Sequence, residues 1–404
     1  MRRIDLKKAQ AARPSTIRDI NRQIVLNYVR DREPISRADI ARETDLQRST
    51  ISTIVEDLKT LGLIEEIGEG ESTGGRRPTL LRLRAAGATA VGVDLTPSGT
   101  TVAASDLAGR VLDREELPSN VERGKLIELI CDAIRRLAAR SGHRGAVEGV
   151  GVSLPGLVDP LTGCAIYIPH FKWRDWPIAQ EIERATSLPV TIDNDANSAA
   201  LAALWFGRPE NSEARDFIMV LVAEGVGTGI VFDGQIYRGE RGAAGEFGHM
   251  IIGVGTDAPV ACSCGNHDCW EAFSSGRAAV ARYLRKISGS DGEVGRSVDL
   301  GGVVDRALAG EQAAVDALTE TAHYLGIGIS NLIAGLSPEA VVVGGPIARA
   351  WPLVEDALTE TIHRSIRRGL PSARIVPSIL GDQSTLLGAI SLVLARKFAL
   401  SNWA

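Results

Sequence analysis

The fold is decided by two stretches that repeat one pattern, VGVDLTPSGTTVAASDLAGRVL at 91–112 and FIMVLVAEGVGTGIVFDGQIY at 217–237. Each stretch predicts three strands joined by two turns, because apolar runs alternate with clusters of turn residues. Helical periodicity and further apolar strands, at 149–153 and 340–343, follow the two stretches. Two such units predict a duplicated α/β body with a cleft between its halves, and a cleft of this kind is the usual ligand site.

Ahead of this body lies a head, residues 1–84, whose pattern predicts a winged helix-turn-helix. A helical stripe runs from Thr16 to Val29, a short helix capped by Ser36 covers 37–43, and a third helix runs from about 48 to 61. Gly62 ends the third helix, and strands at 63–64 and 79–84 enclose a Gly-rich turn that predicts a wing. The expected buried face of the third helix is Ile51, Ile54, Val55, Leu58 and Leu61.

The start of the third helix and the base of the wing carry the expected DNA contacts. In a helix-turn-helix, the N-terminal end of the recognition helix enters the major groove. Basic residues on a wing are well placed to touch phosphates or a minor groove. An ordinary three-helix bundle and a dimerisation module are the alternatives, but the order of helix, helix-turn-helix and wing favours DNA binding. The expected contacts are Arg48, Ser49, Thr50, Thr53, Arg76 and Arg77.

Composition and charge agree with this division. The 404 residues are 44% hydrophobic and 24% charged, which is typical of a globular protein of two or three domains. The head holds 17 Lys and Arg against 13 Asp and Glu, whereas the remainder holds 28 against 37. No run is apolar enough to span a bilayer and no signal peptide is recognised, so a cytoplasmic protein without membrane partners is expected.

Three of the five cysteines, Cys262, Cys264 and Cys269, fall within eight residues. Such clustering without a secretion signal favours a metal site over disulfides. The spacing Cys-x-Cys-x4-Cys supplies three thiolates, and a tetrahedral structural zinc site needs a fourth ligand. His249, thirteen residues upstream, is one candidate; His267 and Asp268 inside the loop are rivals that would need a very tight chelate.

Five blocks of sequence together resemble the ROK family of repressors, open reading frames and kinases. They are GVSLPGLVD at 151–159, DNDANSAA at 193–200, GEFGH at 245–249 and CSCGNHDCWE at 262–271, with GGRRP at 74–78 resembling the head of xylose-repressor-type members. The resemblance covers nearly the whole chain in the right order. It implies an actin-like (ribonuclease H-like, sugar-kinase) body, divided into 88–210 with the sugar motif and 211–404 with the zinc site and dimerisation helices.

The resemblance also implies a sugar site whose residues are held in position by zinc. It gives His249 the fourth ligand place beside the three cysteines, so zinc would orient the ring and hold Glu271 in place. A ring bound to zinc through one nitrogen can offer the other to a sugar hydroxyl. Several fixed donors and acceptors are needed to read hydroxyls. The sugar-binding residues that the resemblance implies are Gly156, Asn194, Asp195, Glu246, His249 and Glu271.

Compared with the kinases of the family, this chain differs in both nucleotide loops but keeps the residue that matches the general base. Asp195 matches the residue that takes the proton of the attacking hydroxyl. The first phosphate loop, Asp-x-Gly-Gly-Thr in kinases, reads DLTPSGT at 94–100, where Leu95, Thr96 and Pro97 remove glycine flexibility and one backbone N–H. In the second loop, Glu224 puts a carboxylate where phosphate oxygens would lie. Catalysis and ATP binding are therefore not expected.

The expected function is a sugar-responsive repressor. A homodimer or homotetramer would present two winged helices to a pseudo-palindromic operator, with a small sugar as the effector. An active ATP-dependent sugar kinase carrying the same head is the rival reading, and a body that senses a partner protein is a third. Sugar specificity is expected from the segment 166–176, which holds His170, Trp173 and Trp176.

Overall fold

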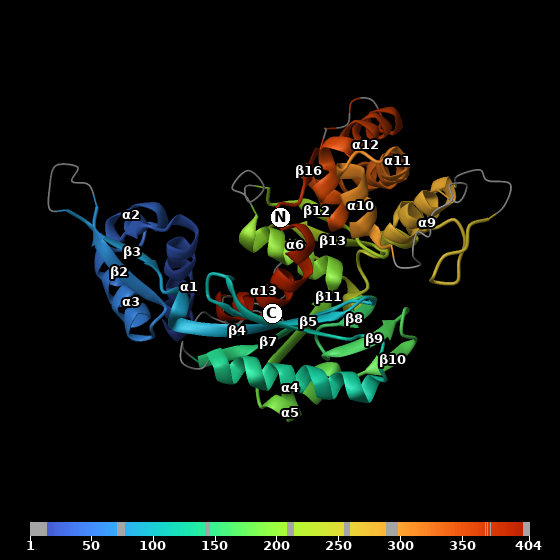
Figure 1. The fold of residues 1–404 in the computed structure, drawn as a ribbon. Helices are drawn as coiled ribbons and strands as arrows, with labels where there is room; N and C mark the ends of the chain where they lie inside the picture. Colours follow the sequence, from blue (N-terminus) through green and yellow to red (C-terminus); the bar gives the residue numbers. More distant parts are fainter. Residues whose placement is uncertain are drawn as a thin grey trace.

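The computed structural model describes residues 14–70, 77–141, 146–207, 214–253, 259–287 and 298–398, without 368, 370 and 372. The head lies at one end of the molecule and joins a body of two lobes (Figure 1). In the described part of the chain, every helix is too short or too polar to cross a membrane.

The head is a winged helix-turn-helix. Its helices are α1 (Pro14–Arg32), α2 (Arg37–Thr44) and α3 (Arg48–Thr60), and its three strands pair in the order β1-β3-β2. The strands are β1 (Ile35–Ser36), β2 (Ile64–Glu69) and β3 (Thr79–Leu83). Ser36 caps α2 by accepting a hydrogen bond from Asp39 N, as predicted. The short strand β1 was not predicted, because two residues carry no periodicity.

One expected core position in the head is wrong. Ile51, Ile54, Val55 and Leu58 are buried, but the side chain of Leu61 is 57% exposed. Leu61 is the residue after the last turn of α3, and its backbone turns towards β2 there. Leu63 and Ile64, which follow, are buried in its place.

The first lobe is built on a five-stranded sheet with the order β11-β7-β4-β5-β6. Helices α4 (Arg123–Ser141) and α5 (Ile178–Thr186) contribute to the hydrophobic core on one face. A small antiparallel sheet, β10-β9-β8, lies between β7 and α5 in the chain. The strands of this lobe are β4 (Ala88–Leu95), β5 (Thr100–Asp106), β6 (Val111–Leu117), β7 (Ala146–Leu154), β8 (Leu157–Asp159), β9 (Cys164–Ile168), β10 (Trp173–Trp176) and β11 (Val190–Asn194).

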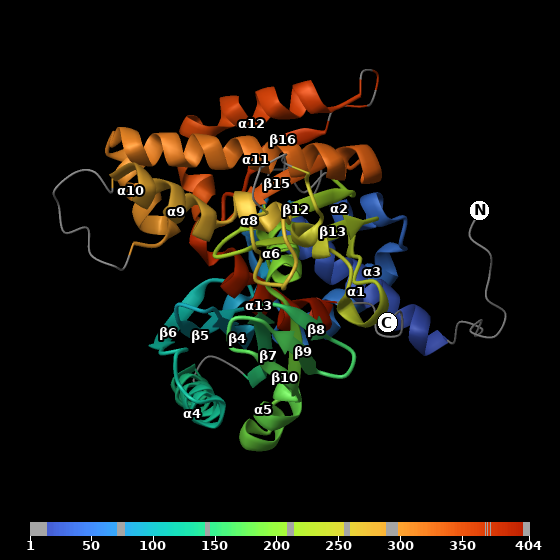
Figure 2. The ribbon, with the colours of Figure 1, turned by 90° about the vertical axis from the view of Figure 1, so that its right-hand side faces the viewer.

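The second lobe repeats the arrangement with the order β14-β13-β12-β15-β16. Its strands are β12 (Phe217–Val222), β13 (Val226–Phe232), β14 (Gln235–Ile236), β15 (Ala340–Gly344) and β16 (Arg374–Pro377). In both lobes the first three strands form an antiparallel meander and the next two add in parallel to the first. The predicted duplication is therefore confirmed. Helices of this lobe stack over one face of its sheet (Figure 2): α8 (Trp270–Ser274), α9 (Gly276–Ile287), α10 (Leu300–Leu308), α11 (Gln312–Leu336) and α12 (Trp351–Ser365).

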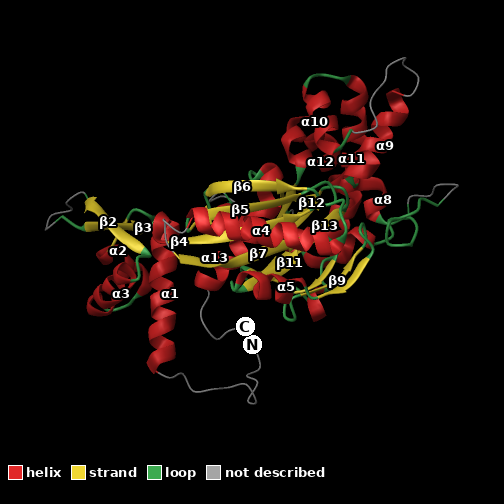
Figure 3. Cartoon of the chain, turned by 60° about the horizontal axis from the view of Figure 1, so that its bottom comes forward, coloured by secondary structure: helices red, strands yellow, loops and turns green. Residues whose placement is uncertain are grey.

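Two helices fill the space between the sheets. Helix α6 (Asp195–Phe206) packs its alanine face on the second sheet, and α13 (Ser384–Phe398) packs on β4, β7 and β11 of the first. The two helices also pack against each other, so the layers run first sheet, α13, α6, second sheet. Figure 3 shows α13 against the first sheet. Residues 384–398, which the expected division placed with 211–404, thus pack with the first lobe.

Candidate functional site

The candidate sugar site begins where β11 of the first lobe ends and α6 starts. Asn194 caps α6, its Oδ1 accepting from the backbone N–H of Ala196 at 2.9 Å and of Asn197 at 3.3 Å. The Nδ2 of Asn194 donates to the carbonyl of Gly156 at 2.9 Å. Gly156 has φ +87°, and a Cβ there would lie 2.4 Å from the carbonyl of Tyr167. Glycine is therefore needed at this position, and Asn194 is fixed before any ligand binds.

Asp195, the first residue of α6, faces a second carboxylate from β4, Asp94. Burial is the largest of the causes that raise the pKa of Asp195 to about 7, and the charges of Asp94 and Glu246 act in the same direction. Burial likewise raises the pKa of Asp94 to about 6, against a hydrogen bond of 2.6 Å from Thr385 Oγ1 on α13. The Oδ1 atom of Asp94 has no hydrogen-bond partner among the described residues. The site thus concentrates carboxylates of two lobes.

The second lobe contributes a 3-10 helix, η4 (Glu246–His249), and α8. The Nε2 atom of His249 lies 3.7 Å from Glu246 Oε2. Burial raises the pKa of Glu246, His249 lowers it, and the charge of Glu271 raises it. Electrostatic interactions therefore link four carboxylates, each to the next: Asp94, Asp195, Glu246 and Glu271. The structure thus brings the expected sugar residues of both lobes to one place.

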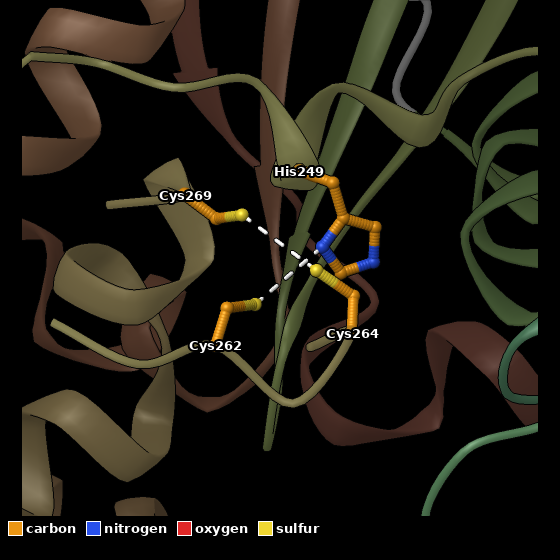
Figure 4. A group of neighbouring side chains, drawn as sticks. All are labelled: His249, Cys262, Cys264 and Cys269. Atoms are coloured by element: carbon orange, nitrogen blue, oxygen red, sulfur yellow. Dashed lines mark hydrogen bonds between the residues drawn. The ribbon is translucent and has the colours of Figure 1, made fainter. Parts of the chain in front are cut away.

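The three cysteines and His249 form the candidate metal centre. Their ligand atoms all lie within 4.8 Å of one another, and the four side chains point towards a common centre (Figure 4). His249 Nδ1 lies 3.6 Å from Cys262 Sγ, and Cys264 Sγ lies 3.7 Å from Cys269 Sγ. Tetrahedral zinc, with Zn–S bonds of about 2.3 Å, separates its sulfur ligands by about 3.8 Å. The four donors therefore fit a structural zinc site.

Neither rival ligand belongs to this group. His267 is exposed and pairs through its backbone with Ala261. The Oδ1 of Asp268 accepts a hydrogen bond of 2.9 Å from Val260 N, which holds the loop rather than the metal. Because His249 points Nδ1 at the sulfur atoms, its Nε2 faces Glu246 and the sugar site.

Glu271 connects the candidate metal centre to the first residue of β13, Val226, beside the loop that carries Glu224. It is 8% exposed, and its Oε2 accepts from Val226 N at 3.1 Å. Its Oε1 accepts from Ser263 Oγ at 2.8 Å and from Arg277 at 2.9 Å. Ser263 and Arg277 were not predicted as site residues, although both lie within eight residues of Glu271. No periodicity or motif marked them, because their role depends on loop packing.

A second missed pair joins the two lobes behind Asn194. Arg238, which follows β14, places Nε and one terminal nitrogen each 2.8 Å from Asp193 Oδ2. The side chain of Asp193 is 2% exposed, and its Oδ1 accepts from Asn194 N at 2.8 Å and from Asn197 Nδ2 at 3.0 Å. Asp193 belongs to the motif at 193–200, but no feature of the sequence links it to Arg238, 45 residues away. Charge-assisted bonds of this geometry are strong and directional.

The turn between β4 and β5, where the resemblance implies a phosphate loop, is closed on itself. Thr96 N donates to the carbonyl of Gly99 at 2.9 Å, and Thr96 Oγ1 donates to the same carbonyl at 2.8 Å. In the second loop, the Oε2 of Glu224 lies 3.9 Å from Nδ1 of His170, which belongs to the first lobe. Arg277 Nε donates to the carbonyl of Glu224 at 3.1 Å. Side chains of this chain thus contact the loops where the resemblance would place phosphate.

The three residues singled out in the aromatic segment 166–176 lie in different surroundings. Trp176 is fully buried, and its Nε1 donates to Glu181 Oε2 at 2.9 Å. Trp176 is therefore a core residue, because its polar edge and its ring are both satisfied inside the lobe. Trp173 stacks on Phe171 with ring centroids 4.4 Å apart. Of the three residues expected to read the sugar, His170 is the one that faces the second lobe.

The candidate DNA surface lies on the head, remote from these groups. Arg48, Ser49 and Thr53 are exposed at the start of α3, and Thr50 is half-buried. Among the described residues Arg48 forms no ion pair, whereas Arg37 is held by Glu56 and Glu66. Arg77, two residues before the returning wing strand β3, is exposed, and Arg76 lies outside the described residues.

Comparison with known proteins matches the head and the body to two different families. Residues 90–396 match the model of the ROK family, and residues 24–77 match that of the MarR family. The chain is 32% identical over 96% of its length to a putative xylose repressor of Caldicellulosiruptor sp., covering 98% of that protein. A crystal structure of a ROK family transcriptional regulator, a homologue of the E. coli MLC protein, has a TM-score of 0.78 at 25% identity, with 95% and 98% of the two chains covered. A ROK glucokinase from Streptomyces griseus, solved with glucose and AMPPNP, has a TM-score of 0.66 at 28% identity over 75% of this chain and 98% of its own.

Proposed function

The chain belongs to the ROK family, and from this membership we propose that it is a sugar-responsive repressor whose body no longer uses ATP. The single observation that carries the proposal is the conjunction, in one chain, of a winged helix-turn-helix and a cluster of polar side chains where the resemblance implies a sugar site. A relative of nearly equal length is described as a putative xylose repressor. The proposed effector is a small sugar, the proposed DNA target is a pseudo-palindromic operator, and the proposed functional unit is a homodimer or homotetramer.

Each group of the proposed sugar site has a distinct task. Asn194 and the Gly156 carbonyl are fixed by one hydrogen bond, so they offer hydroxyl partners at defined positions. Glu246, Glu271 and His249 Nε2 offer further acceptors and one ring nitrogen. Zinc would supply a fixed anchor for His249 Nδ1 and for the loop that ends at Cys269, and it would take no part in chemistry. Zinc as the resident metal is part of the proposal, and the fit of the four donors supports it.

Sugar binding would regulate by preferring one arrangement of the lobes over another. An effector can change operator affinity only as far as its own affinity differs between the two states. Because Asn194 and Asp195 belong to the first lobe and Glu246, His249 and Glu271 to the second, a sugar that contacts both sets holds the lobes in one relative position.

We expect a sugar to change operator affinity at least about fivefold, the lower end of ordinary coupling between sites. The measurement is a fluorescence-anisotropy titration of DNA fragments that the protein selects from its own genome, with xylose, glucose or N-acetylglucosamine present at 10 mM, about the order of magnitude that saturates weak effector sites. Arg48→Ala is expected to weaken DNA binding roughly tenfold and to lower the salt slope by about one. Arg114→Ala, an exposed arginine of β6, is the matched control. Unchanged curves with every sugar would defeat the sensor proposal.

We also expect no phosphoryl transfer from ATP. The first loop is closed by its own hydrogen bonds and carries Pro97, and Glu224 places a carboxylate in the second, so the backbone donors that phosphates require are absent or opposed. A coupled assay with ATP, Mg²⁺ and each sugar should give no turnover above that of Asp195→Asn. Turnover by the wild-type chain that Asp195→Asn abolishes would establish the rival reading, a sugar kinase with a DNA-binding head.

A further inference from the structure

Helix α6 joins the proposed effector site to the head directly. Asn194 caps its start, Asp195 is its first residue, and its last two residues are Trp205 and Phe206. Both aromatic rings pack against the hydrophobic cluster that the head shares with the body, which includes Val25 and Val29 of α1. One regular helix of twelve residues, about 18 Å long, therefore spans the distance from sugar readers to head.

The contact at the far end of α6 is specific. The guanidinium of Arg30, near the end of α1, lies over the ring of Trp205 at 4.2 Å from its centroid. Arg30 also pairs with Asp31 at 2.6 Å, which holds the guanidinium in this position. Phe206 is seated in the turn between β5 and β6, where a Cβ on Gly109 would lie 2.3 Å from the Phe206 ring. Both ends of α6 are thus tied to neighbours.

Helix α13 interlocks with α6 at one point of very close approach. A Cβ at Gly388 of α13 would lie 2.1 Å from the carbonyl of Ser198 in α6. On its other side α13 approaches the first sheet as closely, since a Cβ at Gly151 would lie 1.8 Å from the Ala389 carbonyl. The head packs on this same helix, whose Leu386, Ile390, Val393 and Leu394 belong to the shared cluster. Because glycines let the backbones touch directly at these contacts, the elements have no free space in which to shift relative to each other.

The junction of head and body contains no flexible tether. The connection is a single 3-10 turn, η1 (Ala85–Gly87), in which a Cβ at Gly87 would lie 2.1 Å from the carbonyl of Gly62. Leu107 N donates to the carbonyl of Ala85 at 3.1 Å. Helix α6 meets the second sheet closely as well, since a Cβ at Gly229 of β13 would lie 2.5 Å from the carbonyl of Ala196. Close backbone contacts therefore hold α6 on both of its sides.

We propose that α6 carries effector occupancy to the DNA-binding head, and that the contact between Arg30 and Trp205 is the point of transfer. In this arrangement a sugar that binds at the start of α6 acts on α1 of the head through the far end of the same helix. The inference rests on the proposed function and adds its route. A coupling energy measured between the effector site and the operator site tests this route.

The test compares wild type, Arg30→Ala, Trp205→Leu and the double variant in the full-length protein. Calorimetry with xylose, glucose and N-acetylglucosamine measures sugar affinity, and anisotropy measures operator affinity with and without the sugar. We expect both separate affinities to stay within about threefold of wild type, while the effect of the sugar on operator affinity falls from at least about fivefold to less than about twofold. The double variant should lose no more coupling than either single variant, because both act through one contact.

Two further variants keep the outcome interpretable. Trp205→Phe retains a ring beneath Arg30 and should retain coupling. Arg306→Ala removes a similar contact, over the ring of Tyr283 at 5.8 Å, within the second lobe, and should leave coupling intact. If Trp205→Leu does not fold, Arg30→Ala decides alone. Wild-type coupling in Arg30→Ala would overturn the route while leaving the sensor intact, whereas absence of any sugar effect in the wild type would overturn both.

Discussion

Cys269→Ser should lose the bound metal, about 2–4 kcal/mol of stability and at least tenfold in sugar affinity. Structural zinc contributes about 10 kcal/mol or more where a whole small domain depends on it. Here the metal would organise one loop of a large body, so the loss of stability is smaller. Cys269 is fully buried and directly precedes α8, which carries Glu271. The loss should therefore appear in sugar affinity, since His249 and Glu271 both lose their anchor.

Three measurements on the same preparations check this result: zinc content, thermal unfolding and sugar calorimetry. Cys164→Ser is the matched control, because Cys164 is a free, half-buried thiol of β9 outside the metal centre. It should change stability by less than about 0.5 kcal/mol and leave zinc and sugar binding unchanged. A Cys269→Ser protein that keeps one equivalent of zinc, or that binds sugar as wild type does, would refute the assignment of the site.

The second large effect is expected for Arg238→Ala. Removing one partner of a buried ion pair leaves an uncompensated charge and typically lowers stability by about 3–5 kcal/mol. The side chain of Arg238 is 35% exposed, so water can partly solvate Asp193, and we expect a loss of about 2–3 kcal/mol. Because Asp193 Oδ1 also accepts from Asn194 N, the sugar site should weaken together with the fold.

Arg241→Ala provides the control, since Arg241 also reaches from the second lobe to a buried carboxylate of the first. Its Nε lies 3.6 Å from Asp159 Oδ2, and its side chain is 69% exposed. Asp159 Oδ1 accepts backbone hydrogen bonds from Leu161 and Thr162, so it stays satisfied without the arginine. Urea unfolding should show a loss below about 1 kcal/mol for Arg241→Ala. Equal losses for the two variants would show that the Asp193 pair does not hold the lobes together.

Local sequence patterns predicted much of the architecture. The repeated meander of 91–112 and 217–237 predicted both sheets, because strand alternation and turn residues act over short distances. Ser36 predicted the start of α2 for the same reason, since its hydroxyl caps a backbone N–H three residues on. The cysteine spacing predicted a metal site, because the ligands of a loop chelate must lie close in sequence as well as in space.

Which distant residues pair with each other could be seen only in the three-dimensional structure. Arg238 meets Asp193 from another lobe, Thr385 meets Asp94 across 291 positions, and Arg30 meets Trp205 through the junction of head and body. Such contacts leave no periodicity, because nothing in the local chemistry of either residue depends on the other. Sequence by itself therefore determined most of the elements and the candidate metal-binding loop. The tertiary structure decided which of those elements share a core, because burial and charge pairing depend on what the other lobe presents.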